Sequence, residues 1–300
     1  MSRAPGISGK CPYLRAFPNH TLMNRFFLSV AAAAIGVYAS AQDLPKTSPH
    51  GEVEQVIGLT KVDVDYSRPS VRGRQVFGDM LPFGKLWRLG ANMNTTIEFD
   101  GPVVIDGNKL EKGKYSMFAI PDKEYWVLIF NKNTELWGEG DYKEAQDAMR
   151  MKAKVEPCEF TETLTISFDD VKDDQARMDI RWDKTRVSVT IKADATEQGI
   201  ANIKEAMSKP DIKAGAYNSS ASFALDRKVM TKEALDWASK AVKMDPKFYY
   251  IHTLARAQAA NGLMKEAAAT AQQSMEAAKK AGDMAYVKKN EALLKEWAGK

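Results

Sequence analysis

Cysteine and histidine are nearly absent from this sequence of 300 residues, which holds two of the former and three of the latter. Cys11 lies in a segment that we interpret below as a leader, so Cys158 is the only thiol expected in the mature chain and no intrachain disulfide can form. A cysteine nucleophile needs a histidine partner. His50 lies in an N-terminal tail and His252 in a predicted helix of another region, so we interpret Cys158 as an ordinary strand residue.

The motifs of several enzyme classes are missing too. The sequence has no G-x-S-x-G elbow, no H-E-x-x-H or Cys/His ligand spacing, no P-loop and no dinucleotide fingerprint. The four carboxylates of "DDVKDD", residues 169–174, lack the spacing of a calcium loop and favour a solvated turn. We therefore expect no metal and no cofactor. Catalysis by paired carboxylates stays open, because Asp and Glu are abundant and a pair cannot be located from sequence.

Long apolar runs are scarce, and the N-terminal one, Phe26–Val37, is too short to span a bilayer. Arg25 precedes it and the small residues Ala39-Ser40-Ala41 follow, which is the pattern of a secretory signal peptide. We expect residues 23–41 to be this signal, with cleavage before Gln42 and a periplasmic or secreted product.

Residues 1–22 then form an extension upstream of Met23, the expected initiator. The whole chain has 43 basic and 39 acidic residues, but residues 1–41 contain four Lys or Arg and no Asp or Glu. The remainder is therefore neutral, which argues against nucleic acid as a partner because phosphate affinity depends on excess positive charge. We expect no membrane span after the leader.

Residues 42–193 have the pattern of a β domain. "TKVDVDYS", from Thr60, alternates apolar and polar residues as a half-buried strand does, and "YWVLIFN", from Tyr125, is apolar on both faces. Asp106-Gly107 is a type I′ hairpin signal. Nine or so short strands with short turns predict an antiparallel β-sandwich or barrel, with one short helix around residues 141–149.

Residues 194–300 have a helical pattern throughout, with Thr196 as a candidate N-cap. "KEALDWASKAVKMDP" and "KEAAATAQQSMEAAK" place Ala234 and Ala267 at equivalent positions, which resembles a degenerate tetratricopeptide repeat. The fold class is therefore α+β and multidomain. The helices could offer a groove for a peptide or protein partner, or serve only as a cap on the β domain.

An arginine-rich segment, "YSRPSVRGRQVFGDMLPFGKLWRLGAN" from Tyr66 to Asn92, is neither a clean helix nor a clean strand. The alternation that carries Tyr66 inward also carries Arg68 inward, where a guanidinium needs a carboxylate, carbonyls or a ligand. The segment could bind a carboxylate, a phosphate or a sugar, or it could only pin long loops to the sheet. The candidate ligand-binding residues, some from nearby strands, are Arg68, Arg72, Trp87, Arg88, Asn92, Thr95, Ser116 and Asn131.

Five ordered motifs carry a family resemblance: "YSRPSVRGRQVFG", "LPFGKLWRLGAN", "TTIEF", "GKYSMFAIP" and "IFNKNTELWG". Together they resemble the family called domain of unknown function 2911 over about residues 48–193, and the helical tail with "EALDWASKAV" resembles the tail common in that family. The resemblance implies an exported bacterial protein with a β-rich domain. It implies no activity and no catalytic residues.

Two functions are compatible with these observations. The first is a periplasmic binding or scaffold protein whose β domain holds a small anionic or carbohydrate ligand at the Arg/Asn/Thr-rich segment. The alternative is a carboxylate-dependent hydrolase or lyase acting on glycan of the cell envelope. Two free carboxyl groups facing each other across a cleft would favour the enzyme, and a surface of arginines and amides without a free acid would favour binding.

Overall fold

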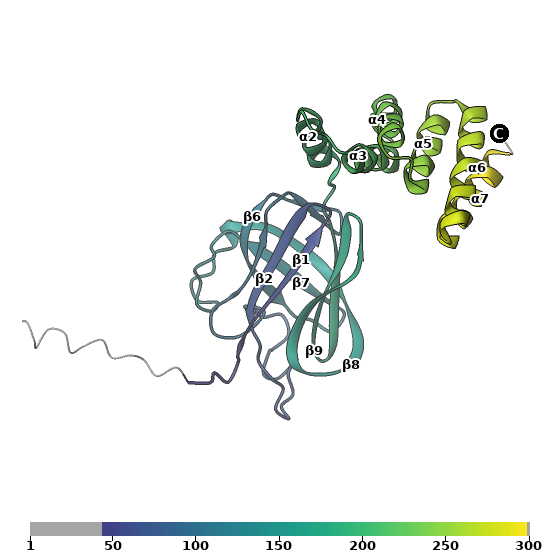
Figure 1. The fold of residues 1–300 in the computed structure, drawn as a ribbon. Coiled ribbons are helices and arrows are strands. Elements are labelled where there is room, and N and C mark those ends of the chain that lie inside the picture. Colours follow the sequence, from purple (N-terminus) through teal and green to yellow (C-terminus); the bar gives the residue numbers. More distant parts are fainter. Residues whose placement is uncertain (1–43, 299–300) are drawn as a thin grey trace, which may run out of the picture. The chain divides into compact units, whose positions relative to one another are not determined.

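The computed structural model describes residues 44–298, so the expected leader and its cleavage site lie outside the described residues. The described chain comprises a β-region followed by a helical region, as the change of pattern near residue 194 predicts (Figure 1). The two regions are taken separately below. β9 ends at Lys192 and α2 begins at Thr196.

The β-region forms nine antiparallel strands, which confirms the predicted α+β class with an antiparallel β-region. Short turns separate most of them, and the longest connection, between β2 and β3, is the arginine-rich segment. The strands are β1 (His50–Ile57), β2 (Thr60–Ser67), β3 (Thr95–Phe99), β4 (Val103–Ile105), β5 (Asn108–Leu110), β6 (Gly113–Ile120), β7 (Tyr125–Asn131), β8 (Asp147–Lys172) and β9 (Gln175–Lys192).

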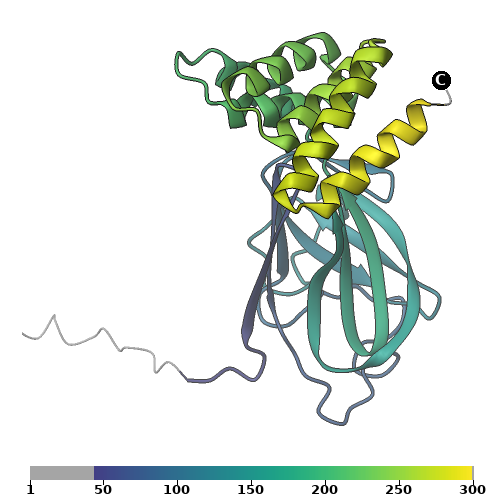
Figure 2. The ribbon, with the colours of Figure 1, turned by 45° about the vertical axis from the view of Figure 1, so that its right-hand side comes forward.

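All nine strands join in one sheet with the order β1-β2-β3-β6-β7-β8-β9-β4-β5. β8 is long enough to pair with β7 along its first part and with β9 along its second, and the β8–β9 hairpin is the longest in the molecule (Figure 2). Its register shifts around Thr161, where a bulge bends a strand. Past the end of β2, Val71 N donates to Glu162 O at 2.8 Å and Leu164 N donates to Pro69 O at 2.9 Å. These bonds bring the β2 and β8 sides of the sheet together around the core.

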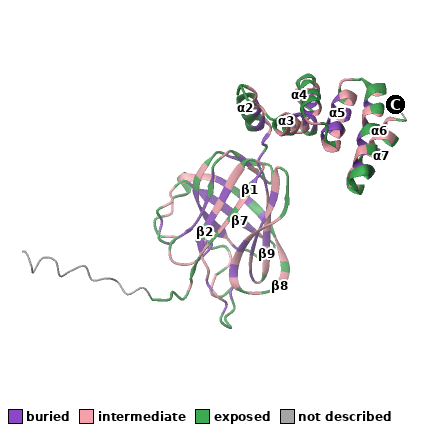
Figure 3. Cartoon of the chain, in the orientation of Figure 1, coloured by how far each residue is buried: buried purple, intermediate pink, exposed green. Residues whose placement is uncertain are grey.

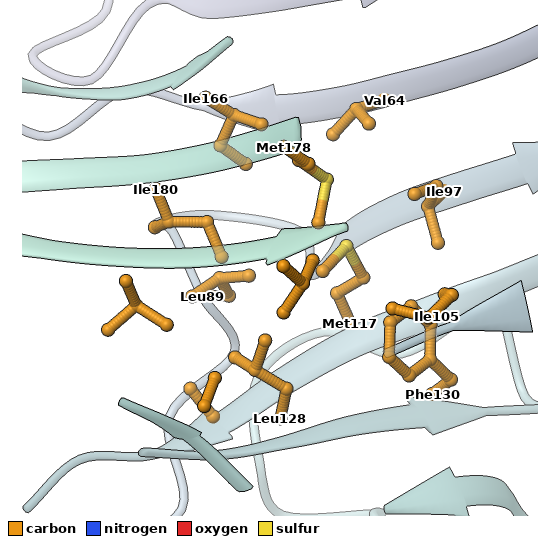
Figure 4. Packing of buried hydrophobic residues seen from close by; sticks show 14 of the residues in the cluster. Val64, Leu89, Ile97, Ile105, Met117, Leu128, Phe130, Ile166, Met178 and Ile180 are labelled. Atoms are coloured by element: carbon orange, nitrogen blue, oxygen red, sulfur yellow. The ribbon is translucent and has the colours of Figure 1, made fainter. Parts of the chain in front are cut away.

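The core of the β-region consists of large apolar side chains from nearly every strand (Figure 4). The alternation in β2 is confirmed, since Val62 and Val64 are fully buried. Four aromatic rings pack together at the centre, with centroids 5.1–6.4 Å apart. They belong to Phe77, Trp87, Trp126 and Trp182.

Two local predictions have opposite outcomes. The two-residue turn between β4 and β5 is confirmed, because Asp106 (φ 44°) and Gly107 (φ 86°) both have the positive φ that a type I′ turn requires. The short helix expected at residues 141–149 is wrong. Only Glu144–Gln146 form one 3₁₀ turn, because β8 already begins at Asp147, which pairs with the end of β7.

The helical region contains six helices in the described chain, joined by short turns. None of them is long and apolar enough to cross a membrane. Each presents one face to its neighbours and one to solvent (Figure 3). They are α2 (Thr196–Met207), α3 (Ala214–Arg227), α4 (Thr231–Met244), α5 (Phe248–Ala260), α6 (Met264–Ala281) and α7 (Met284–Trp297). Thr196 is the first helical residue rather than the N-cap, and its N–H donates to Asp194 Oδ1 at 2.8 Å.

Alanines occupy most of the fully buried positions in these helices. Ala234 on α4 and Ala267 on α6, the pair that defines the repeat, are both fully buried, as are Ala241 and Ala257. Such small residues allow neighbouring helices to approach closely. Among the larger side chains, Trp237 is 8% exposed, whereas Leu263 is 39% exposed.

A chain of hydrogen bonds links α5, α6 and α7. Asn290, fully buried, faces His252 Nδ1 with its Oδ1 at 2.8 Å and donates from Nδ2 to Ser274 Oγ at 3.0 Å. Ser274 Oγ in turn donates to Phe248 O at 2.7 Å. Burial lowers the pKa of His252, and the hydrogen bond with Asn290 opposes this only in part.

Candidate functional site

Arg68 and Arg72 both bond to the second part of β8. Arg68 Nε donates to Leu164 O at 3.0 Å, and its Nη2 donates to Thr165 Oγ1 at 2.9 Å. The guanidinium therefore meets neutral acceptors rather than a buried carboxylate. Arg72 is exposed, has a φ of 51°, and donates from its backbone N to Glu162 Oε1 at 2.9 Å. Both arginines hold the arginine-rich segment against β8.

The loop that precedes β3 is closed by its own side chains. Trp87 Nε1 donates to Gly90 O at 3.0 Å, and Thr95 Oγ1 donates to Leu89 O at 2.8 Å. Arg88 Nη1 donates to Asn92 O at 2.5 Å, which spans the same turn. The turn needs these bonds, because Leu89 (φ 54°) and Asn92 (φ 58°) both adopt the left-handed conformation that costs free energy outside glycine.

A second polar group lies where β3, β6 and β7 meet. Ser116 is fully buried, accepts from Asn94 Nδ2 and donates to Asn133 O at 2.5 Å. Asn131, also fully buried, donates to Asp147 Oδ1 at 2.8 Å and accepts from Asn133 N at 2.9 Å. Asn94 Oδ1 is buried without a hydrogen-bond partner in the described part of the chain.

The eight predicted residues thus fall into separate groups. The loop before β3 brings Trp87, Arg88, Asn92 and Thr95 together, whereas Ser116 and Asn131 join through Asn133. Arg68 and Arg72 contact β8 instead. Every one of the eight side chains makes at least one hydrogen bond to another residue's backbone or side chain, and Trp87 does so through its indole N–H.

The exposed part of this region is a small surface around Trp137. Arg88 donates from its backbone N to Glu139 Oε1 at 3.0 Å and from Nε to the same oxygen at 3.2 Å. Trp137, two residues before Glu139, is 70% exposed. Asn94 N donates to Leu136 O at 3.3 Å, so Met93, which is 52% exposed, adjoins the same loop. We call Trp137, Met93, Arg88 and Glu139 the Trp137 surface.

Anchors on both sides of Trp137 fix this loop. Leu136 is 3% exposed and packs with Phe118 and Ile129 on the outer face of β6 and β7. On the other side, Gly138 has a φ of 91°, and a Cβ there would lie 3.5 Å from the Arg88 guanidinium. The Trp137 indole therefore projects from a loop that is held on one side by Leu136 and on the other by Glu139.

Two carboxylates near this surface are engaged, whereas Glu135 and Asp141 are exposed and make no ion pair within the described residues. Glu139 is paired with Arg88, and Asp147 accepts from Tyr142 Oη at 2.6 Å and pairs with Arg150 Nε at 3.2 Å. Burial and the bond to Asp147 raise the pKa of Tyr142. Within residues 44–298, no group of three or more His, Cys, Asp or Glu is arranged to hold a metal ion.

Sequence reasoning missed Trp137 and Glu139, although "IFNKNTELWG" contains the tryptophan. The signal that could have found Trp137 is its position between acidic residues and a glycine, outside any strand pattern. A tryptophan in such a loop is not expected to be buried in the core.

Comparison with known proteins agrees with the motif resemblance. Residues 48–191 match the model of a family described as Protein of unknown function (DUF2911). This segment resembles the DUF2911 family. The match ends at the close of β9, so the domain is the β-region, and the six helices follow it. No curated protein and no solved structure matches the chain.

Proposed function

We propose that this chain is an exported binding protein whose DUF2911-like domain holds a glycan or a small anionic ligand on the Trp137 surface, beside the arginine-rich segment. The single observation that carries the proposal is the 70% exposure of Trp137 on a loop anchored at Leu136 and Glu139. Tryptophan is enriched at binding interfaces, and rigid attachment lowers the entropy cost of ordering its ring on binding.

The chemistry around the indole suits a sugar. The ring supplies a flat apolar face, and the Arg88–Glu139 pair beside it supplies polar groups at its edge. The Arg88 side chain is 27% exposed and that of Glu139 is 34% exposed, so both keep surface for a ligand. Binding sites commonly combine one aromatic anchor with a few fixed polar groups.

The state of the acidic groups supports binding rather than catalysis. General acid–base chemistry on a glycan needs a pair of carboxyl groups facing the substrate. Here Glu139 is tied to Arg88, and Asp147 is bonded to Tyr142 and Arg150. These contacts favour a fixed surface around Glu139 and Asp147, and the hydrolase or lyase alternative would have to use the exposed Glu135 or Asp141.

Calorimetric titration of the mature chain with a panel of neutral oligosaccharides tests the proposal. We expect at least one oligosaccharide to bind, and Trp137→Ala to weaken it by about tenfold or more, because aromatic anchors dominate such interfaces. Phe160→Ala is the matched control, since Phe160 is a 53% exposed aromatic on the same domain. Equal affinity of Trp137→Ala and the wild-type chain would overturn the proposal.

A further inference from the structure

The outer face of β7 and β8 is covered at one end only. Tyr125, Val127 and Ile129 of β7 lie opposite Lys154, Lys152 and Arg150 of β8, respectively, and all six belong to the face turned away from the core. Leu136 and Tyr142 pack over the Ile129 end. The Tyr125 end has no such cover, and a shallow cavity of 660 Å³ lies there.

Three lysines line this cavity against one acidic residue. The lining consists of Lys123, Glu124, Tyr125, Lys152, Lys154 and Val155, and we call it the lysine groove. Lys152 Nζ lies 4.1 Å from the centre of the Tyr125 ring, and Lys123 Nζ lies 5.9 Å from that of Phe83. The ammonium groups of Lys152 and Lys123 therefore contact aromatic rings rather than carboxylates.

The pairing of the basic residues along β8 differs between the two ends. Arg150 is paired with Glu144 at 2.6 Å and with Asp147 at 3.2 Å. Within residues 44–298, no carboxylate lies within ion-pair distance of Lys152, Lys154 or Lys123. The three lysines of the groove are therefore free of ion pairs and outnumber its one acidic residue, Glu124, where the sheet face is also uncovered.

We propose that the lysine groove binds an acidic polysaccharide through repeated carboxylates. Lys152 and Lys154 project from alternate residues of one strand, about 7 Å apart. Two lysine ammonium groups on flexible side chains can each bind one of the spaced carboxylates of a polysaccharide. A single phosphate favours donors that converge on one point.

The aromatic content of the groove selects the saccharide over an acidic peptide. Tyr125 is partly exposed and lines the groove, so its ring, which also contacts Lys152 Nζ, offers an aromatic face to the C–H groups of a sugar ring. A run of Asp or Glu side chains offers charge without such a face. The groove is lined by none of the residues of the Trp137 surface, so this proposal does not depend on the proposed function.

Titration with sodium alginate oligosaccharides tests the proposal, with a neutral maltooligosaccharide of equal length and polyglutamate as comparison ligands. We expect the wild-type chain to bind alginate, with affinity that falls as salt rises. Lys152→Gln/Lys154→Gln should weaken alginate binding about tenfold or more and lower the salt slope by about one for each lysine removed. Tyr125→Ala should weaken alginate more than polyglutamate.

The matched control is Lys109→Gln/Lys114→Gln, which removes the same charge from exposed lysines on β5 and β6. Equal losses in the control and the groove variant, or no alginate binding by the wild-type chain, would overturn the proposal. Polyglutamate binding as tight as alginate binding and indifferent to Tyr125→Ala would overturn it too. Alginate binding that is lost in Trp137→Ala but kept in Lys152→Gln/Lys154→Gln would assign the alginate site to the Trp137 surface and would overturn the proposal.

Discussion

The interiors of the β-region and the helical region are filled by side chains of different size. In the β-region the largest fully buried side chains include Trp126, Trp182 and Phe99, drawn from strands distant in sequence. In the helical region most of the fully buried side chains are alanines, and Asn290 and Ser274 are buried among them. A wide space between curled strands needs volume, whereas helices that approach closely have room for little more than a methyl group. The β-region should therefore be destabilised most by loss of side-chain volume, and the helical region by added volume.

Removing volume from the β-region should give the largest effect. Trp126 is 1% exposed and contacts Trp87 and Phe77 through its ring. Trp126→Ala should lower the free energy of unfolding by about 3–5 kcal/mol, because a cavity is left that the surrounding strands cannot fill. Urea denaturation followed by near-ultraviolet circular dichroism measures it. Phe160→Ala, at an exposed site, should change the value little, and an equal loss there would contradict the comparison.

Adding volume to the helical region should come next. Ala267 is fully buried between helices, so Ala267→Leu should cost about 1–3 kcal/mol through overpacking. Ala269→Leu, at an exposed position of α6, is the control and should be neutral or slightly destabilising. Thermal denaturation followed by far-ultraviolet circular dichroism compares them. Tolerance of leucine at residue 267 would show that the helices do not need small residues there.

The arginine-rich segment should show a smaller effect. Arg68 donates to Leu164 O and Thr165 Oγ1, both neutral acceptors, so Arg68→Met should cost about 1–2 kcal/mol. A buried ion pair would cost about 3–5 kcal/mol when broken. Chemical denaturation distinguishes the two values. Exposed Arg72→Met serves as the control, and its loss should be smaller.

The smallest effect should be a pH dependence confined to the helical region. Burial lowers the pKa of His252 below its ordinary value of 6.5, with Arg256 and Lys289 acting in the same direction. The unfolded chain therefore binds the proton more readily, and stability should fall as the pH falls below about 6.5. Unfolding midpoints at pH 7.5 and 5.5 measure this, and His252→Gln should reduce the difference. An unchanged difference would exclude His252 as its source.

Much of the fold could be predicted because its signals are local. The alternation in Val62 and Val64, the Asp106-Gly107 turn and the repeat of Ala234 and Ala267 each depend on a few neighbouring residues. The short helix expected near residue 145 failed, because the pairing of β8 with β7 overrode a local helical pattern. Tertiary pairing of this kind is not visible in a single stretch of sequence.

The candidate site was less predictable for a related reason. Arg68, Arg88 and Asn131 were picked for their residue types, but their partners, Leu164, Glu139 and Asp147, are far away in sequence. Whether an arginine binds a ligand or the protein depends on those partners. Ligand binding by the eight candidate residues stays a prediction, and so does export through the leader.

Tryptophan fluorescence tests the central claim about Trp137 most directly. Of the six tryptophans, Trp137 is 70% exposed, and Trp297→Phe removes another that is partly exposed. In that variant, acrylamide should quench mainly the emission of Trp137. We expect a bound oligosaccharide from the panel to shield this emission in a saturable way, and Trp137→Phe to abolish the shielded component. Binding of the oligosaccharide with no change in quenching would contradict the claim that Trp137 is the ligand-binding surface.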